Sequence, residues 1–144
     1  MSTYRRAVLK LVAYAWAAPN TAFGISIGLL MLGLGGGVRV VAGVAEFHGG
    51  RAGCFFASLP GPFCFGAVTL GHVILGTCHN ELAALREHEH VHVRQYEQWG
   101  MFFLPAYALA SAWEVIHGRC GYRGNFFERQ AYAVEGNKKL RVDL

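Results

Sequence analysis

Charged residues are scarce in this chain. Asp, Glu, Lys and Arg make up 15% of its 144 residues and hydrophobic residues make up 53%, whereas ordinary soluble domains carry about 25% charged residues. Neither of its two basic groups, one before the first apolar stretch (Arg5, Arg6 and Lys10) and one in the tail (Lys138, Lys139 and Arg141), has aromatic residues interleaved as a nucleic-acid platform needs, so no nucleic-acid partner is expected. The basic residues instead flank apolar segments, which predicts contact with membrane lipid.

Cysteine is also scarce, and internal repeats are missing. The four cysteines form no C-x-x-C pair, which argues against a cysteine-rich zinc finger. A Cys54–Cys64 disulfide would require an oxidising compartment, so buried free thiols are the expected state. The length of 144 residues suits one hydrophobic core.

The stretch from Leu11 to Val38 contains no charged residue. It is long enough for the about 20 apolar residues that cross a bilayer as a helix, and Pro19 marks a point where the helix begins or kinks. Arg5 and Arg6 would also suit a signal peptide, but no small-x-small cleavage site follows directly. A retained N-terminal transmembrane helix is therefore expected.

The rest of the chain predicts a mixture of strands and helices. The β-branched residues 38–47 predict one strand or a short hairpin, and residues 67–76 predict a second strand. The intervening residues 49–66 are rich in glycine and proline and predict a loop. The expected fold class is α+β, with residues 1–37 as a membrane anchor and residues 38–144 as a metallopeptidase-like zinc domain with a small β-sheet.

Three helices are expected in the C-terminal half. Asn80 can cap a helix over residues 81–99, which Gly100 ends. The apolar stretch over residues 101–116 is short for a membrane span, and predicts a buried core helix or a segment that re-enters the bilayer. A short last helix is expected over residues 126–134, before a basic tail.

The first of these helices carries the motif His88-Glu89-His90-Val91-His92. Histidines at positions i and i+4 of a helix point the same way, so His88 and His92 can bind one ion. Zinc takes nitrogen ligands at about 2.0–2.1 Å in a nearly tetrahedral arrangement. Glu89 is turned around the helix from His88, so it is expected to act as a general base on a water bound to the ion rather than as a ligand.

The place of the motif on its helix supports this interpretation. One stripe of the helix holds His88 and His92 together with apolar or aromatic residues: Leu85, Tyr96 and Trp99. Unpaired imidazoles on that stripe would be costly, which argues against incidental histidines. An extended chain would align His88, His90 and His92, but the flanking residues are strong helix formers. On a helix His90 points away from the ion and is expected at the surface.

A catalytic zinc ion keeps three protein ligands and one open position. The residues after His92 that could supply the third ligand are Glu97, Glu114, His117, Glu128 and Glu135. Glu97 lies on the polar face of the same helix. Glu128, at the start of the last helix, is preferred, and Glu114, at the end of the apolar helix, is its main competitor.

His-Glu-x-x-His followed by Glu-x-x-Ala on a later helix resembles the gluzincin metallopeptidases, and the membrane-bound branch of that family most of all. The matching residues are His88, Glu89, His92, Glu128 and Ala131. The resemblance implies that Glu128 is the third ligand and that the alanine allows its helix to pack closely on the motif helix. It also implies an edge strand that binds extended substrate, for which residues 69–75 are the counterpart.

The chain departs from the family pattern at Tyr132, where an aspartate usually follows the alanine. The hydrogen-bond acceptor that a metal-bound imidazole needs must then come from another residue. The chain is also similar to short bacterial membrane proteins with a His-Glu-x-Val-His-x-x-Gln core, which implies the bacterial inner membrane as its location.

These observations and the resemblance predict zinc-dependent hydrolysis of a peptide or protein substrate by a small membrane-anchored metallopeptidase. Catalysis also requires a group that stabilises the developing oxyanion. The residues considered for this role are His72, His117, Tyr122 and Tyr132. Two alternatives stay open, namely a zinc-binding protein without catalytic activity and a structural subunit of a membrane protein complex.

The uncharged stretch generates the first testable prediction. The full-length protein should sediment with membranes and require detergent for extraction, because residues 11–38 are long enough to remain in a bilayer. Membrane fractionation followed by detergent and carbonate extraction checks this. Full-length protein recovered in the supernatant without detergent would contradict any membrane anchor.

Overall fold

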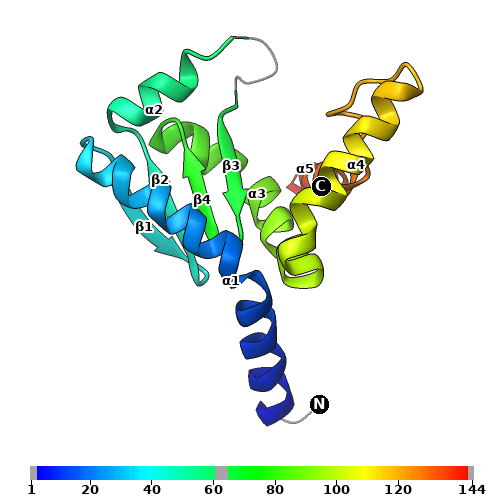
Figure 1. The fold of residues 1–144 in the computed structure, drawn as a ribbon, viewed down its shortest axis with the longest axis horizontal. Helices are drawn as coiled ribbons and strands as arrows, with labels where there is room; N and C mark the ends of the chain where they lie inside the picture. The colour runs from blue at the N-terminus through cyan, green and yellow to red at the C-terminus, as the bar shows by residue number, and fades with distance from the viewer. Residues whose placement is uncertain (1–2, 61–64, 143–144) are drawn as a thin grey trace.

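The computed structural model describes residues 3–60 and 65–142, which form an α+β fold (Figure 1). Its elements in chain order are α1 (Thr3–Gly33), β1 (Gly37–Val41), β2 (Val44–His48), α2 (Gly50–Ala57), β3 (Ala67–Leu70), β4 (Val73–Gly76), α3 (His79–Trp99), the 3-10 turn η2 (Gly100–Phe102), α4 (Phe103–Ile116) and α5 (Phe126–Val142). The predicted α+β class is thereby confirmed.

The four strands form one mixed sheet in the order β1-β2-β4-β3. β1 and β2 form an antiparallel hairpin, one of the two forms expected for residues 38–47. β2 and β4 run parallel, and β3 pairs antiparallel with β4 at the edge of the sheet. The prediction of one strand over residues 67–76 is wrong, because Gly71 adopts a φ of 62° and turns the chain between β3 and β4.

Two further sequence predictions are corrected in this half of the chain. Residues 49–66 are not loop throughout, because α2 lies within them. Cys54 is exposed, as are Cys78 and Cys120, so these thiols are not buried as expected. Cys64 lies outside the described residues, and the Cys54–Cys64 pairing lies outside them too.

Helices cover both faces of the sheet. On one face, Met31 of α1 packs with Phe47, Val73 and Leu75 of the strands. On the other face, Ile74 of β4 packs with two residues of α3, Leu82 and Val93. The alternation of Val73, Ile74 and Leu75 between the two layers is the period-2 pattern of a strand that is buried on both faces. The motif helix α3 is therefore fixed against the sheet along its length.

A buried carboxylate sets the rotation of α3. Glu46 of β2 has no exposed surface, and the guanidinium of Arg86 donates to both of its oxygens, at 2.7 and 3.0 Å. Arg39 approaches the same carboxylate at 3.3 Å, and His90 Nε2 lies 3.8 Å from it. His90 points away from the motif pair as predicted, but it is not a surface residue, since it keeps only 22% of its side-chain exposure.

The ends of the C-terminal helices also differ from the predictions. Asn80 was expected to cap α3, but the helix begins at His79 and the Cys78 sulfur accepts the Glu81 N–H at 3.5 Å. The last helix was expected to end near residue 134, yet α5 continues to Val142.

Two helical stretches, Ala7–Gly33 and His79–Ile116, are long and apolar enough to cross a membrane by length and composition. The helix α1 continues through Pro19 without a break. Its N-terminal half projects away from the sheet, whereas its C-terminal half lies along it (Figure 1). That C-terminal half is thus part of the hydrophobic core as well as of the apolar stretch.

Two glycines allow α1 to approach the sheet closely. A Cβ at Gly28 would lie 2.5 Å from the Phe47 ring, and one at Gly24 would lie 2.9 Å from the Val73 Cβ. Gly24 and Gly28 are one helical turn apart, so they form a single contact face. By contrast, a Cβ at Gly33 would meet nothing within 4 Å.

This contact generates the second prediction. Gly28→Ala should lower the free energy of unfolding by about 1–2 kcal/mol, because overpacking against a buried ring outweighs the gain in helix propensity. Gly33→Ala is the matched control and should be neutral or stabilising by up to about 1 kcal/mol. Denaturant unfolding in detergent measures both, and equal effects of the two substitutions would show that the close approach is unimportant.

Candidate metal centre

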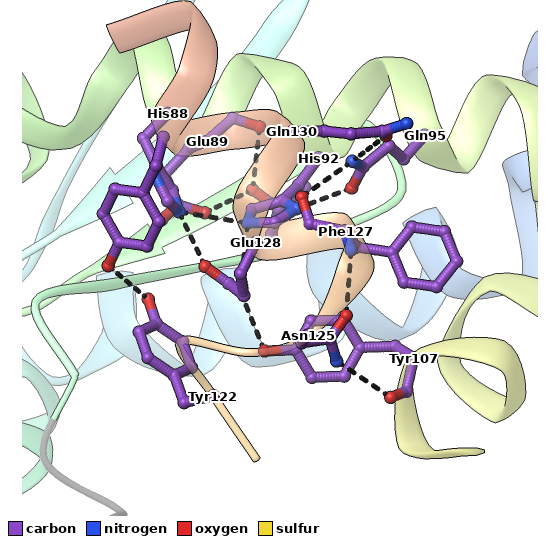
Figure 2. A network of polar contacts seen from close by, with 12 residues as sticks. His88, Glu89, His92, Gln95, Tyr107, Tyr122, Asn125, Phe127, Glu128 and Gln130 are labelled. Carbon is purple, nitrogen blue, oxygen red and sulfur yellow. Dashed lines mark hydrogen bonds and ion pairs between the residues drawn. The ribbon is translucent and has the colours of Figure 1, made fainter. Parts of the chain in front are cut away.

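The last helix, α5, places a glutamate next to the motif helix α3. Asn125 caps α5, because its Oδ1 accepts the Phe127 N–H at 2.9 Å. The Asn125 amide also donates to the Tyr107 carbonyl at 3.0 Å and to the Ser111 hydroxyl at 2.7 Å, which ties the start of α5 to α4. Glu128 lies in the first turn of α5 and points toward α3 (Figure 2).

His88, His92 and Glu128 meet in a buried cluster (Figure 2). The Nε2 atoms of the two histidines are 3.2 Å apart. Glu128 Oε2 lies 3.1 Å from His88 Nε2, and Glu128 Oε1 lies 3.4 Å from His92 Nε2. Of the residues that the structure describes, these three are the group whose ligand atoms converge closely enough to hold a metal ion.

The cluster has the dimensions of a tetrahedral metal site. Ligands about 2.0–2.1 Å from a tetrahedral ion are separated from one another by about 3.3 Å. The three observed separations, 3.1, 3.2 and 3.4 Å, lie around that value. Two imidazoles and one carboxylate are also a donor set that zinc accepts, and they leave one position for another group. The residues present therefore fit the ion that the motif predicts.

Gln95 fixes the proton of His92. Its amide nitrogen donates to the Phe127 carbonyl at 3.0 Å and to Gln130 Oε1 at 2.9 Å, so its oxygen must face the other way. That oxygen lies 2.8 Å from His92 Nδ1. His92 Nδ1 therefore carries a hydrogen, and the Nε2 atom of the ring faces Glu128 and His88.

Sequence reasoning left the role of Gln95 unassigned. The sequence left open which residue accepts the hydrogen bond of the imidazole, since Tyr132 stands where the resembled family has an aspartate. Gln95, one turn after His92 on the motif helix, is that acceptor. The available signal was the spacing, since residues three apart on a helix face each other. The Gln in the His-Glu-x-Val-His-x-x-Gln core is this residue.

Glu89 stands beside the cluster but outside it. The Thr69 hydroxyl of β3 donates to Glu89 Oε2 at 2.6 Å and holds the carboxylate against the edge strand. Burial raises the pKa of Glu89, and the Thr69 hydrogen bond and the two histidines oppose that rise only in part. A raised pKa suits a group that takes up a proton and gives it away again.

Glu128 has the opposite electrostatic character. Burial alone would raise its pKa, but hydrogen bonds from His88 and His92 together with one from the Tyr107 hydroxyl hold the pKa well below its usual range. Tyr107 Oη donates to Glu128 Oε1 at 2.8 Å. Glu128 is therefore a carboxylate at neutral pH, the charge state that a metal ligand requires.

The cluster opens into a cavity of about 570 Å³. His88, Glu89, His92 and Glu128 lie on its wall, together with residues 67–69 of β3. The remaining wall is largely aromatic or aliphatic: Phe65, Leu85, Tyr96, Phe103, Leu104, Tyr107, Tyr122 and Tyr132. Such a space, apolar with a few convergent polar groups, is typical of a ligand site.

Other candidate residues lie outside the cluster. Glu97 contacts His72 at 3.1 Å on the far side of α3, and His72 also stacks on Tyr14. Glu114 forms an ion pair with Arg119, and His117 is exposed at the end of α4. The side chain of Glu135 lies outside the described residues. Tyr122 and Tyr132 line the cavity, unlike His72 and His117.

No protein-family model, curated protein or solved structure matches this chain. The resemblance to gluzincins therefore depends on the motif residues and their arrangement.

The third prediction concerns Gln95. Gln95→Leu should weaken zinc affinity about 10–100-fold, because His92 loses the acceptor that fixes its tautomer. Gln98→Leu, an exposed position on the same helix, is the matched control and should leave the affinity unchanged. Competition titration with a chromogenic chelator measures both. Unchanged affinity in Gln95→Leu would show that the hydrogen bond has no part in metal binding.

Proposed function

We propose that this chain is a membrane-anchored zinc metallopeptidase that hydrolyses peptide bonds. The proposal is based on the different surroundings of two buried glutamates, Glu128 and Glu89. Glu128 completes a triangle with His88 and His92 at the spacing of a tetrahedral ion. Glu89 is bound instead by Thr69 and faces the same cavity.

Each residue then has a distinct task. His88, His92 and Glu128 would hold the ion, which would supply Lewis acidity and make water acidic enough to lose a proton near neutral pH. Glu89 removes a proton from the attacking water and transfers it to the amine nitrogen as the C–N bond breaks. Thr69 orients Glu89 for both transfers through the 2.6 Å hydrogen bond.

The edge strand supports a peptide as the substrate. β3 pairs with β4 on one side and forms the edge of the described sheet on the other. Ala67, Val68 and Thr69 of this strand line the cavity beside Glu89. An extended peptide can therefore add to the sheet through main-chain hydrogen bonds and pass the catalytic residues. We therefore propose β3, residues 67–70, as the counterpart of the family's substrate strand in place of residues 69–75.

Two tyrosines are placed to stabilise the oxyanion. The rings of Tyr132 and His88 form a T-shaped contact with centroids 4.8 Å apart. The Tyr132 hydroxyl donates to the Tyr122 hydroxyl at 3.4 Å. Both side chains line the cavity. Phenolic hydroxyls next to a metal centre can donate to a carbonyl oxygen that gains charge. We assign this role to the Tyr122–Tyr132 pair.

The fourth prediction separates ligand from base. Glu128→Ala should lose zinc and thermal stability, since an ion that binds only the folded state stabilises it. Glu89→Gln should keep zinc and stability but lose peptide hydrolysis, because an amide cannot accept the proton. Zinc content, melting temperature and cleavage of a generic peptide library are measured for the wild type and both variants.

Glu114→Gln is the control for removing a carboxylate away from the cavity, and it should retain both zinc and activity. Loss of zinc in Glu114→Gln together with retention in Glu128→Ala would make the ligand assignment wrong. Loss of zinc in Glu89→Gln would make Glu89 itself a ligand and would exclude the proposed mechanism.

A further inference from the structure

An exposed aromatic cluster lies where α1 meets η2. Trp16 of α1 packs against Phe102 with ring centroids 5.8 Å apart, and both side chains are largely exposed. Trp99 and Met101 are exposed next to them on the same turn. We call these four residues the aromatic corner: Trp16, Trp99, Met101 and Phe102. The Asn20 amide donates to the Gly100 carbonyl at 3.3 Å and fixes the turn against α1.

The free part of α1 starts at this corner. Tyr14 stacks on His72, so the helix lies on the body of the protein from that residue onward. Before it, α1 projects away from the other elements (Figure 1). Its apolar side chains are exposed at Val8, Leu9, Leu11 and Val12. At about 100° per residue, these four positions fall within one arc of about 160°, and Lys10 lies opposite the centre of that arc.

The chemistry of the two sides of this helix indicates what covers it. An apolar face opposite a basic one is typical of a helix that lies at a membrane interface. The basic residues Arg5, Arg6 and Lys10 lie on the same stretch, and they suit the anionic head groups of a bilayer. Trp residues are enriched where a protein passes from hydrocarbon to water. A lipid bilayer therefore fits both the free helix and the corner at its base.

Length determines how deep the protein sits. Residues 3–13 rise about 16 Å at about 1.5 Å per residue, whereas the hydrocarbon core is about 30 Å thick. The described free part of α1 thus corresponds to about half of that thickness. Burial of the corner in the interface brings this free start of the apolar stretch Ala7–Gly33 into contact with lipid.

The catalytic cavity follows the corner directly in the chain. Phe102 belongs to the corner, while the next two residues, Phe103 and Leu104, line the cavity. We infer that the aromatic corner is a membrane-docking surface that holds the cavity at the bilayer interface. The substrates are then interfacial segments of membrane polypeptides rather than peptides free in water. The inference about substrates rests on the proposed peptidase function, whereas docking does not.

Tryptophan quenching tests the docking. The full-length protein is reconstituted in vesicles of phosphatidylcholine and phosphatidylglycerol with brominated acyl chains. The Trp113→Phe variant, which keeps both tryptophans of the corner, should be strongly quenched. The Trp16→Phe/Trp99→Phe variant reports Trp113 at the far end of α4 and should be quenched weakly, with zinc content as the check on folding. The reverse order, or equal quenching of the two variants, would overturn the docking surface.

Cleavage tests the substrate class, and two exposed phenylalanines provide a matched pair. Phe102 is 55% exposed at the corner and Phe55 is 60% exposed on α2. Phe102→Ser should slow cleavage of a lipid-anchored peptide about tenfold, because an interfacial aromatic contact is lost, and should leave cleavage of the same peptide in solution unchanged. Phe55→Ser should alter neither rate.

The outcomes separate the two proposals. The substrate inference would be overturned if Phe102→Ser slowed cleavage of the anchored and the free peptide equally. It would also be overturned if Phe102→Ser and Phe55→Ser slowed cleavage of the anchored peptide equally. Failure of the wild type to cleave either peptide would overturn the peptidase function, and the substrate inference with it, while quenching would still decide the docking surface. Concentration-dependent dimerisation without quenching would assign the corner to a second copy of the chain and would overturn membrane docking.

Discussion

The convergence of two imidazoles and a carboxylate in a buried space is the constraint on which the rest of the structure depends. Such groups are costly to bury unless each is paired, so the elements that carry them must be held in register. The Glu46–Arg86 ion pair sets the rotation of α3 from one side. Asn125 sets the start of α5 from the other side, through α4. A cation at the centre would balance the negative charge of the Glu128 carboxylate.

Local patterns predicted the elements better than their connections. The motif helix followed from its periodicity and the apolar helix from its lack of charge, while the β-branched residues 38–47 predicted either one strand or the hairpin that is present. The turn at Gly71 was missed because residues 67–76 are mostly apolar, and a strand buried on both faces shows no alternation that would reveal a reversal. The cap of α3 was misplaced because a cysteine sulfur, a weak acceptor, takes the place that Asn80 was expected to fill.

The candidate site was predictable to the extent that its chemistry is local. His88, Glu89 and His92 follow from the i, i+4 geometry of one helix. The choice of Glu128 over Glu114 as the third ligand required the family resemblance. The contacts of Thr69, Tyr107 and Gln130 arise only after folding, since each joins elements distant in the chain. The polar face of α3 was expected to face water, but Glu46 is buried beneath it and pairs with Arg86. A single sequence does not reveal such a pairing.

The forty-residue separation of His88 and Glu128 has a consequence for biosynthesis. Chains emerge from the ribosome N-terminus first, and domains fold as units once their residues are available. The hydrophobic α1 is therefore translated and can engage the membrane well before α5 emerges. Until then, the two histidines are one ligand short. The order of translation thus delays assembly of the candidate metal centre until α5 has emerged, when the apolar α1 has already been available to a bilayer.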